Sequence, residues 1–327
     1  MTVFRKFFLS DRCHPSSALL SLLLLVGCSH PPTPASLPSP DAVNGEAALE
    51  EVARFVALGP RDSGTPGASR AAAYLLERLR GQGYRALLDG YLSEAPGGAR
   101  AFANVYGVPP TVSGNTLSNV LATTSQPVVI LLSHFDTKTD IAEDFTGAND
   151  SGSSTGLLLY LAGLLSASGA SSPLVVLAFV DGEECRHQYG PTDGLHGSRH
   201  LAQQIEAWGQ VDRIRAVIVL DMIGDTHLTV RIPHNTTRTL LKMAFAAAEE
   251  EGVRQHFGIS SGTILDDHVP FLVRKMPAID LIDFEYGSAP GLNDYWHTEA
   301  DTMDKLSAES LATMARVVLR MLEQLAL

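Results

Sequence analysis

The chain has 327 residues, 45% of them hydrophobic, so it is long enough and apolar enough to bury a sizeable core. Its formal net charge of −12 excludes the general class of nucleic-acid-binding proteins, which present an excess of Lys and Arg to phosphates. Of its three cysteines, Cys13 and Cys28 lie in or beside an N-terminal export segment and leave Cys185 alone, which excludes a disulfide framework.

Residues 1–27 have the pattern of a signal peptide. Basic residues near the start precede an apolar run over residues 18–26, which is too short to cross a bilayer. The run ends in Leu25-Val26-Gly27-Cys28, which resembles the bacterial lipobox and implies that Cys28 is lipidated and becomes the mature N-terminus. The alternative is an ordinary membrane anchor with an incidental cysteine. The small residues before Cys28 and the proline-rich segment after it favour the lipobox.

Residues 28–44 are rich in proline, which opposes helix formation and strand pairing, so they are predicted to form an extended tether. Residues 45–327 then form a single domain. We expect an exported bacterial lipoprotein, periplasmic or at the cell surface, attached to a membrane through the lipid on Cys28. Ser29 follows that cysteine in place of a retention-type Asp, which favours the outer membrane.

Helix-like and strand-like segments alternate along the domain. Helices are expected over residues 46–58, 68–82, 152–166, 198–207, 238–251 and 307–327. Short apolar runs rich in β-branched residues, which are typical of buried strands, lie between them at residues 128–132, 174–180, 216–220 and 278–282. Residues 84–91 and 119–123 are expected to form an antiparallel edge pair. The pattern predicts an α/β fold, a three-layer α/β/α sandwich with a mostly parallel central sheet.

Polar residues able to bind a metal follow each strong strand. Ligands of such sheets bind beyond the carboxyl ends of the strands, so these residues are expected to form one site. Imidazole and carboxylate groups are ligands that zinc prefers. Taken singly, each candidate has a plainer interpretation, such as a helix N-cap for Asp150, a strand end for Asp221 or a surface turn for His297. The candidate ligands are His134, Asp150, Glu184, Asp221 and His297.

Their spacing resembles that of the zinc aminopeptidase clan. The motifs that carry the resemblance are His134-Phe135-Asp136, Asn149-Asp150-Ser151-Gly152, Glu183-Glu184, Leu220-Asp221-Met222 and His297-Thr298. The resemblance covers nearly all of the chain after the tether.

The resemblance to this clan also implies roles for individual residues. Asp150, Glu184 and His297 correspond to the ligands of one zinc ion. His134 and Asp221 correspond to the additional ligands of a second zinc. Glu183 corresponds to the general acid/base, and Asp136 to the group that orients His134 from behind.

Within the clan, the sequence resembles the zinc-dependent glutaminyl-peptide cyclotransferases. The stretches that carry this resemblance are residues 134–138, 179–202, 266–272 and 296–301. The family's reaction converts the N-terminal glutamine of peptides or proteins to pyroglutamate and releases ammonia. The resemblance therefore implies N-terminal glutaminyl substrates, with zinc acting as a Lewis acid on the amide oxygen.

The same resemblance assigns Asp266 to steadying the leaving nitrogen and Asp221 to a hydrogen bond with Asp266. Two carboxyl groups at so short a distance share a proton. A shared proton would weaken Asp221 as a metal ligand and favour one zinc ion over two. Trp296 and Tyr189 are expected to line the substrate pocket. For Trp296 the alternative is packing in the core.

Two other functions remain open from the sequence. An aminopeptidase with two zinc ions is the principal alternative, because all five ligands that it requires are present. A non-catalytic binding lipoprotein on the same fold is the third possibility. Retention of the complete acid/base and ligand set argues against it.

Overall fold

The computed structural model describes residues 37–168 and 173–327. The predicted signal peptide and Cys28 lie outside the described residues. No helix in the described part of the chain is both long and apolar enough to span a membrane. Residues 37–44, which composition assigns to the tether, already contact the domain: Leu37 and Val43 pack against its core, and Pro40–Ala42 form a short helical turn.

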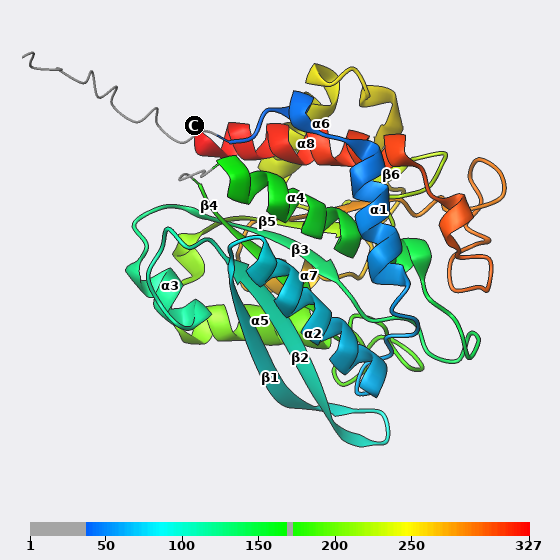
Figure 1. Ribbon diagram of the computed structural model, residues 1–327, viewed down its shortest axis with the longest axis horizontal. Coiled ribbons are helices and arrows are strands. Elements are labelled where there is room, and N and C mark those ends of the chain that lie inside the picture. Colours follow the sequence, from blue (N-terminus) through cyan, green and yellow to red (C-terminus); the bar gives the residue numbers. More distant parts are fainter. Residues whose placement is uncertain (1–36, 169–172) are drawn as a thin grey trace, which may run out of the picture. The chain divides into compact units, whose positions relative to one another are not determined.

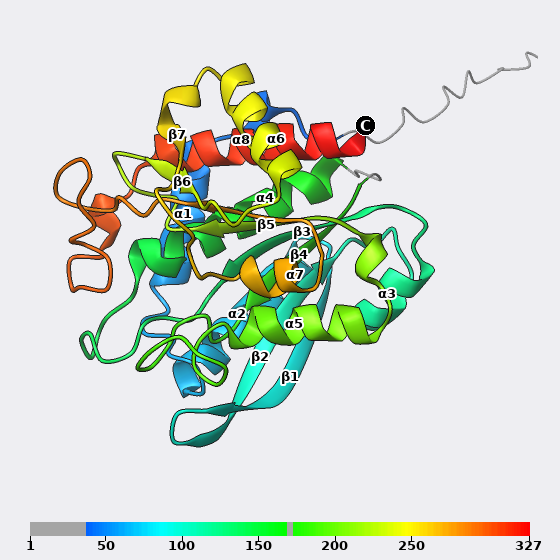
Figure 2. The same ribbon diagram turned by 180° about the vertical axis from the view of Figure 1, so that it is seen from behind.

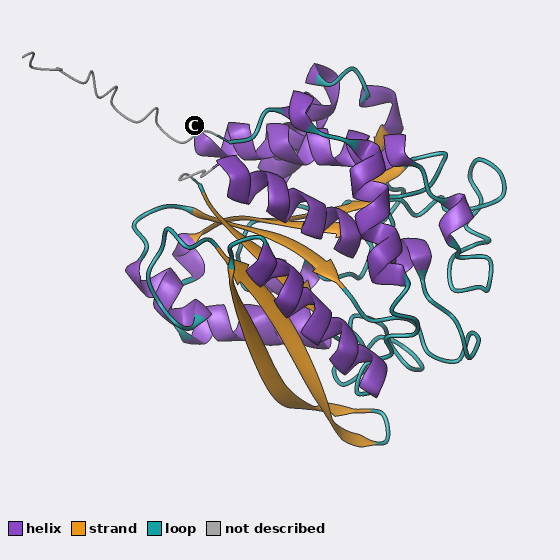
Figure 3. Cartoon of the chain, in the orientation of Figure 1, coloured by secondary structure: helices purple, strands orange, loops and turns teal. Residues whose placement is uncertain are grey.

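A twisted six-stranded sheet forms the middle layer. Its spatial order is β1 (Arg85–Ala95), β2 (Gly98–Val108), β4 (Leu174–Val180), β3 (Val128–His134), β5 (Ile214–Asp221) and β8 (Ala278–Ile282). The last four strands of that order are mutually parallel, whereas β2 runs antiparallel to both β1 and β4. Figure 3 shows the long β1–β2 hairpin, which reaches past the parallel strands. A separate small sheet pairs β6 (Val230–Ile232) with β7 (Phe257–Ile259).

Helices cover both faces of the large sheet. One face packs against α1 (Gly45–Val56), α2 (Pro66–Gly81), α4 (Ser154–Ser168), α6 (Arg238–Glu250) and α8 (Ala308–Ala326). The other face packs against α3 (Leu117–Thr123), α5 (His196–Ala207) and α7 (Val269–Val273). Figures 1 and 2 show α4 and α8 on one side of the strands and α5 on the other. The predicted three-layer sandwich is therefore confirmed.

Side chains along the central strands point alternately to the two faces of the sheet, and this explains why the sequences of these strands are continuously apolar. In β3, Val129 and Leu131 point into the core on the α4 side, whereas Ile130 and Leu132 point into the core on the α5 side. Successive side chains of a strand face opposite sides of the sheet, so a strand covered on both faces needs apolar residues at every position.

One predicted strand is wrong. Residues 119–123 belong to helix α3, which begins after Thr116; the Thr116 side chain accepts a hydrogen bond from the backbone N–H of Asn119. The helix buries Leu117, Val120 and Leu121, whose spacing is helical. The edge strand β1 pairs instead with β2, whose glycine- and alanine-rich sequence gives a weak strand signal. Gly97 closes this hairpin with a φ of 87°, which glycine adopts readily.

Close packing of α4 against α1 provides a test of the fold. A Cβ atom added at Gly156 would lie 2.5 Å from Val52 Cα, so Gly156→Ala must push the two helices apart. We expect this change to lower the free energy of unfolding by about 1–3 kcal/mol. Gly163 in the same helix is the matched control, because a Cβ there would meet only Gln82 Nε2 at 3.6 Å. Gly163→Ala should raise stability by about 0.5–1 kcal/mol. Urea unfolding compares the two, and equal effects would contradict the packing argument.

Candidate active site

The parallel strands deliver the predicted site residues to one edge of the sheet. His134 is the last residue of β3 and Asp221 is the last residue of β5. Glu183 and Glu184 follow closely after the end of β4, which lies beside β3. The convergence expected from the sequence is thus present, and it follows from the parallel direction of these strands.

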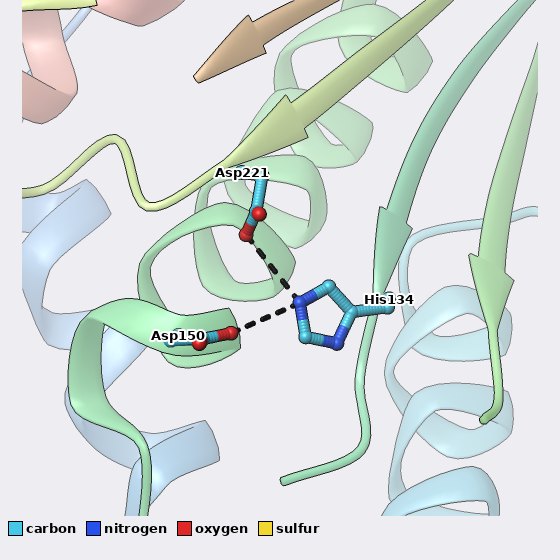
Figure 4. A group of neighbouring side chains, drawn as sticks. All are labelled: His134, Asp150 and Asp221. Carbon is cyan, nitrogen blue, oxygen red and sulfur yellow. Dashed lines mark ion pairs between the residues drawn. The ribbon is translucent and has the colours of Figure 1, made fainter. Parts of the chain in front are cut away.

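His134, Asp150 and Asp221 form one buried cluster, shown in Figure 4. His134 Nε2 lies 3.1 Å from Asp150 Oδ1 and 3.4 Å from Asp221 Oδ1. On the opposite side of the ring, His134 Nδ1 lies 3.5 Å from Asp136 Oδ1. Burial lowers the pKa of His134, but its contacts with the three carboxylates outweigh burial and raise it well above the usual value.

Asp150, Glu184 and His297 form a second cluster that shares Asp150 with the first. His297 Nε2 lies 3.0 Å from Glu184 Oε1 and 3.3 Å from Asp150 Oδ2. Burial lowers the pKa of His297, but hydrogen bonds with the two carboxylates prevail and raise it to about 9. These are the three residues predicted to bind one zinc ion.

The carboxylate of Asp136 organises the loop after β4. Its Oδ1 accepts hydrogen bonds from the backbone N–H groups of Gly182 and Glu183, at 2.9 and 3.1 Å. Its Oδ2 accepts from the N–H of Glu184 at 3.1 Å. A fully buried carboxylate is stable in this position because three amide dipoles face it. Asp136 therefore fixes the backbone of the two glutamates and also faces His134.

Asp301 plays a comparable part behind Asp150. Its two oxygens accept hydrogen bonds from the backbone N–H groups of Asn149 and Asp150, at 2.7 and 3.2 Å. The Tyr286 hydroxyl donates to Asp301 Oδ1 at 2.8 Å. These contacts hold the distorted helical segment Ala148–Ser153, in which Asp150 departs from helical backbone angles. The side chain of Asp150 is thereby directed toward both clusters.

Glu183 is almost fully buried beside this site. Both of its carboxylate oxygens accept a hydrogen bond from the Tyr189 hydroxyl, at 2.9 and 3.1 Å. Burial raises the pKa of Glu183 well above its usual value, and the nearby charges of Glu184 and Asp266 add to that effect. A carboxyl group with a raised pKa is a better proton acceptor when ionised, as a general acid/base requires.

Asp221, Asp266 and Asp280 form a group of buried acids next to Glu183. Asp266 is 4% exposed and Asp280 is fully buried. Burial raises the pKa of Asp266, and repulsion from Asp221 and Asp267 raises it further. The pKa of Asp280 is raised in the same way, by burial first and by Asp266 next. Burial and mutual repulsion therefore both favour the protonated forms of these carboxyl groups.

Trp296 lies at the rim of the second cluster. Its ring stacks on the ring of His297 with centroids 4.0 Å apart, and Phe284 is tilted against it with centroids 5.0 Å apart. The side chain is only partly buried. The structure therefore places an apolar surface beside a predicted metal ligand, where a pocket wall is expected.

The donor set of the second cluster fits a zinc ion. Two carboxylates and one imidazole offer oxygen and nitrogen atoms within 4.8 Å of one another, and three protein ligands leave a position open for substrate. Glu184 Oε2 is buried and accepts no hydrogen bond among the described residues, although Lys138 Nζ lies 3.5 Å from it, so this oxygen is available to a cation. The first cluster has the same kind of donors, so both sites that the sequence suggested are sterically available.

The sequence reasoning did not assign roles to three further residues near the site. Arg61 is fully buried and donates hydrogen bonds to the carbonyl oxygens of Phe135 and Gly147. Lys138 Nζ lies 3.5 Å from Glu184 Oε2. Asp280 had a visible signal, because it is a charged residue inside the apolar strand 278–282. Arg61 had none, because two of its partners, the carbonyl oxygens of Phe135 and Gly147, belong to backbone far away in the sequence.

Comparison with known proteins agrees with this geometry. Residues 115–322 match the family model "Peptidase family M28". The chain is 28% identical over 287 residues to a glutaminyl-peptide cyclotransferase of Drosophila melanogaster, covering 80% of this chain and 76% of that protein. The fold is similar to that of an Acidobacteriales bacterium glutaminyl cyclase, with 31% identity, a TM-score of 0.78 and coverage of 91% of this chain and 98% of the other.

The fold is also similar to that of a Zn-dependent exopeptidase from Parabacteroides distasonis, with 25% identity, a TM-score of 0.72 and coverage of 89% and 99% of the two chains. The family model spans well over half of the sequence, and it includes all ten of the predicted site residues. The chain therefore belongs to peptidase family M28, and among its relatives in sequence and in fold are glutaminyl cyclases.

Proposed function

We infer that the protein is a glutaminyl-peptide cyclotransferase, which converts N-terminal glutamine of peptides or proteins to pyroglutamate and releases ammonia. The observation that carries this inference is Glu183, a buried acid with a raised pKa, which adjoins the ligand candidate Glu184 in sequence and is close enough to the buried Asp266 for their charges to interact. The similarity to glutaminyl cyclases over most of the chain supports it.

The reaction needs a proton acceptor and a proton donor but no activated water. The α-amine of the substrate attacks its own γ-carboxamide carbon, closes a five-membered ring and expels ammonia. A zinc ion held by Asp150, Glu184 and His297 would supply Lewis-acid polarisation of the amide oxygen. Glu183 accepts a proton from the attacking amine and returns it to the leaving nitrogen. Its neighbour in sequence, Glu184, is thus a ligand, while Glu183 handles the proton.

Asp266 and Asp221 act on the leaving group side of the site. Asp266 would form a hydrogen bond with the departing nitrogen and steady it, while the proton that converts this nitrogen to ammonia comes from Glu183. Burial raises the pKa of Asp221, although the imidazole of His134, 3.4 Å away, opposes this. A carboxyl group that retains a proton is a poor ligand for a cation. We therefore propose one zinc ion per chain, bound at the second cluster.

Trp296 would cover the aliphatic stem of the substrate glutamine. Its partly buried ring lies against His297, so an apolar group placed there stays next to the metal site. Exclusion of water from this face would strengthen the electrostatic interactions inside the pocket.

An aminopeptidase is the second candidate. The observation that favours it is the first cluster, in which His134, Asp150 and Asp221 offer donors to a second cation. The similarity to a Zn-dependent exopeptidase is also in its favour. This reaction would use a water molecule as nucleophile, and zinc ions held by the two clusters would supply its activation.

We also propose that Cys28 is lipidated and anchors the protein to a membrane after export. The support is the sequence Leu25-Val26-Gly27-Cys28 after a short apolar run. Residues 28–36 would then act as a tether that leaves the catalytic domain in the periplasm or at the cell surface, with the outer membrane favoured.

Substrate choice separates the two enzymatic functions. The purified protein should release ammonia from a glutaminyl peptide, with a mass loss of about 17 Da, and leave a leucyl peptide intact, because only glutamine carries the internal carboxamide that cyclisation requires. Mass spectrometry on both peptides in parallel measures this. Cleavage of the leucyl peptide without cyclisation of the other would assign the protein to the aminopeptidases.

The adjacent glutamates provide a matched pair for the metal site. We expect wild-type protein to hold about one zinc per chain. Glu184→Gln removes a ligand charge and should lower zinc content severalfold. Glu183→Gln should keep the zinc and lower kcat by about 100- to 10,000-fold, because only proton transfer is lost. Elemental analysis and ammonia release are the two measurements. Two tightly held ions in the wild type, or loss of zinc in Glu183→Gln, would overturn these assignments.

If Cys28 is lipidated, attachment of the protein to the membrane should depend on this one residue. In a bacterial host, the full chain should incorporate labelled fatty acid and fractionate with membranes. Cys28→Ala should abolish the label and leave the signal peptide uncleaved by the lipoprotein route. Cys185→Ala is the control and should retain the label. Incorporation that survives Cys28→Ala would exclude the lipobox.

A further inference from the structure

The loop between β4 and α5 is folded back on Glu183 by its own hydrogen bonds. The two oxygens of Asp193 accept from the backbone N–H groups of Arg186, His187 and Gln188, at 2.7, 2.9 and 3.1 Å. The Leu195 N–H donates to the Glu183 carbonyl oxygen at 2.9 Å, which closes the loop at its base. The loop is therefore a defined structure, and Tyr189 lies within it.

The backbone of Gly194 provides the space that the Tyr189 ring occupies. A Cβ atom at Gly194 would lie 2.4 Å from Tyr189 Cδ1, and Gly194 has a φ of 77°. A side chain at this position would therefore displace the ring. The ring is held between the loop and the site, with its hydroxyl directed at Glu183.

The Tyr189 hydroxyl contacts both oxygens of the Glu183 carboxylate, at 2.9 and 3.1 Å. No other group in residues 37–168 and 173–327 donates a hydrogen bond to these oxygens. Glu183 is only 5% exposed, so water has little access to replace this donor. The terminal torsion of a glutamate is broad, and a carboxylate without a donor would rotate among several orientations.

We propose that Tyr189 is a positioning residue for the reaction, which holds the Glu183 carboxylate in the one orientation that allows proton transfer. The sequence predicted Tyr189 only as a wall of the substrate pocket. The inference deepens the proposed function and rests on Glu183 being the general acid/base. Proton transfer requires a carboxylate oxygen of Glu183 within hydrogen-bond distance of the reacting nitrogen. The hydrogen bond from Tyr189 would hold the carboxylate in that orientation before the substrate binds.

Deleting the hydroxyl alone tests the proposal. Tyr189→Phe keeps the ring against Gly194 and the apolar wall, so KM for a glutaminyl peptide should change by less than about twofold. The rate constant kcat should fall by about 10- to 100-fold, the usual effect of losing a hydrogen bond to a charged group. Tyr91→Phe is the matched control, because the Tyr91 hydroxyl is buried without a partner among the described residues. It should leave both constants unchanged.

A double-mutant cycle separates positioning from a structural effect. If Tyr189 acts through Glu183, then adding Tyr189→Phe to Glu183→Ala should change the residual kcat by less than about twofold. A structural role would lower kcat by the same factor in both backgrounds. Equal losses in the two backgrounds, or a raised KM with an unchanged kcat in Tyr189→Phe alone, would overturn the proposal. Equal melting temperatures of wild type and Tyr189→Phe confirm that the comparison is between folded proteins.

Failure of the proposed function has a different signature. Wild-type protein that hydrolyses a leucyl peptide and does not cyclise a glutaminyl peptide would refute the cyclase assignment. The Tyr189 cycle would then be measured on the leucyl peptide, because Glu183 serves as the acid/base in that reaction as well. The split between kcat and KM remains interpretable in either case.

Discussion

Negative charge buried at the carboxyl edge of the sheet is the constraint on which the rest of the site depends. Isolated ionised carboxylates are expensive to remove from water, so each one must be neutralised, hydrogen-bonded or paired. The molecule uses all three solutions. Asp136 faces three backbone N–H groups, and Asp301 faces two and a tyrosine hydroxyl. Burial raises the pKa of Asp280 well above its usual value, which favours its neutral form. Arg61 supplies a buried positive charge, and burial lowers the pKa of its guanidinium only to about 10. A cation held by Asp150, Glu184 and His297 would complete this balance.

Backbone strain also occurs at this edge of the sheet. Among residues other than glycine, His297 has a φ of 54° and Met222, directly after Asp221, has a φ of 47°. Each such conformation costs about 1–3 kcal/mol and persists only where the surroundings enforce it. The rigid parallel strands provide that enforcement, since β3 and β5 are hydrogen-bonded neighbours buried on both faces. The sheet fixes the origin of each loop, and the strained residues then aim the side chains, as is common for sites built on loops of a stable scaffold.

Much of this arrangement could be predicted from the sequence because it depends on local pattern. Continuous apolar runs identify the strands, and polar residues at their ends identify the edge at which His134 and Asp221 meet. Strand β2 was missed because Gly and Ala give little signal, and its pairing with β1 is a tertiary effect. The contact of Tyr189 with Glu183 was equally hidden, because it depends on the fold of the loop and on the space left by Gly194. Sequence spacing indicates which residues share a site. The hydrogen-bond partner of each polar atom depends on how the loops fold in three dimensions, which the sequence pattern does not show.

The shared geometry also explains how one fold serves two reactions. Hydrolysis of a peptide bond requires a water molecule to be made nucleophilic, which a second cation at His134 and Asp221 would assist. In cyclisation the nucleophile is the substrate's own α-amine, which is covalently linked to the carboxamide and close enough to form a five-membered ring. No metal ion is therefore needed to activate a nucleophile. The chemistry then depends on how the acids beside Glu183 distribute their protons. Two opposing effects act on the pKa of Asp221. Burial raises it and favours the protonated form, whereas His134 Nε2 at 3.4 Å favours the charged form. A proton retained there removes a ligand from the first cluster and leaves the second one complete.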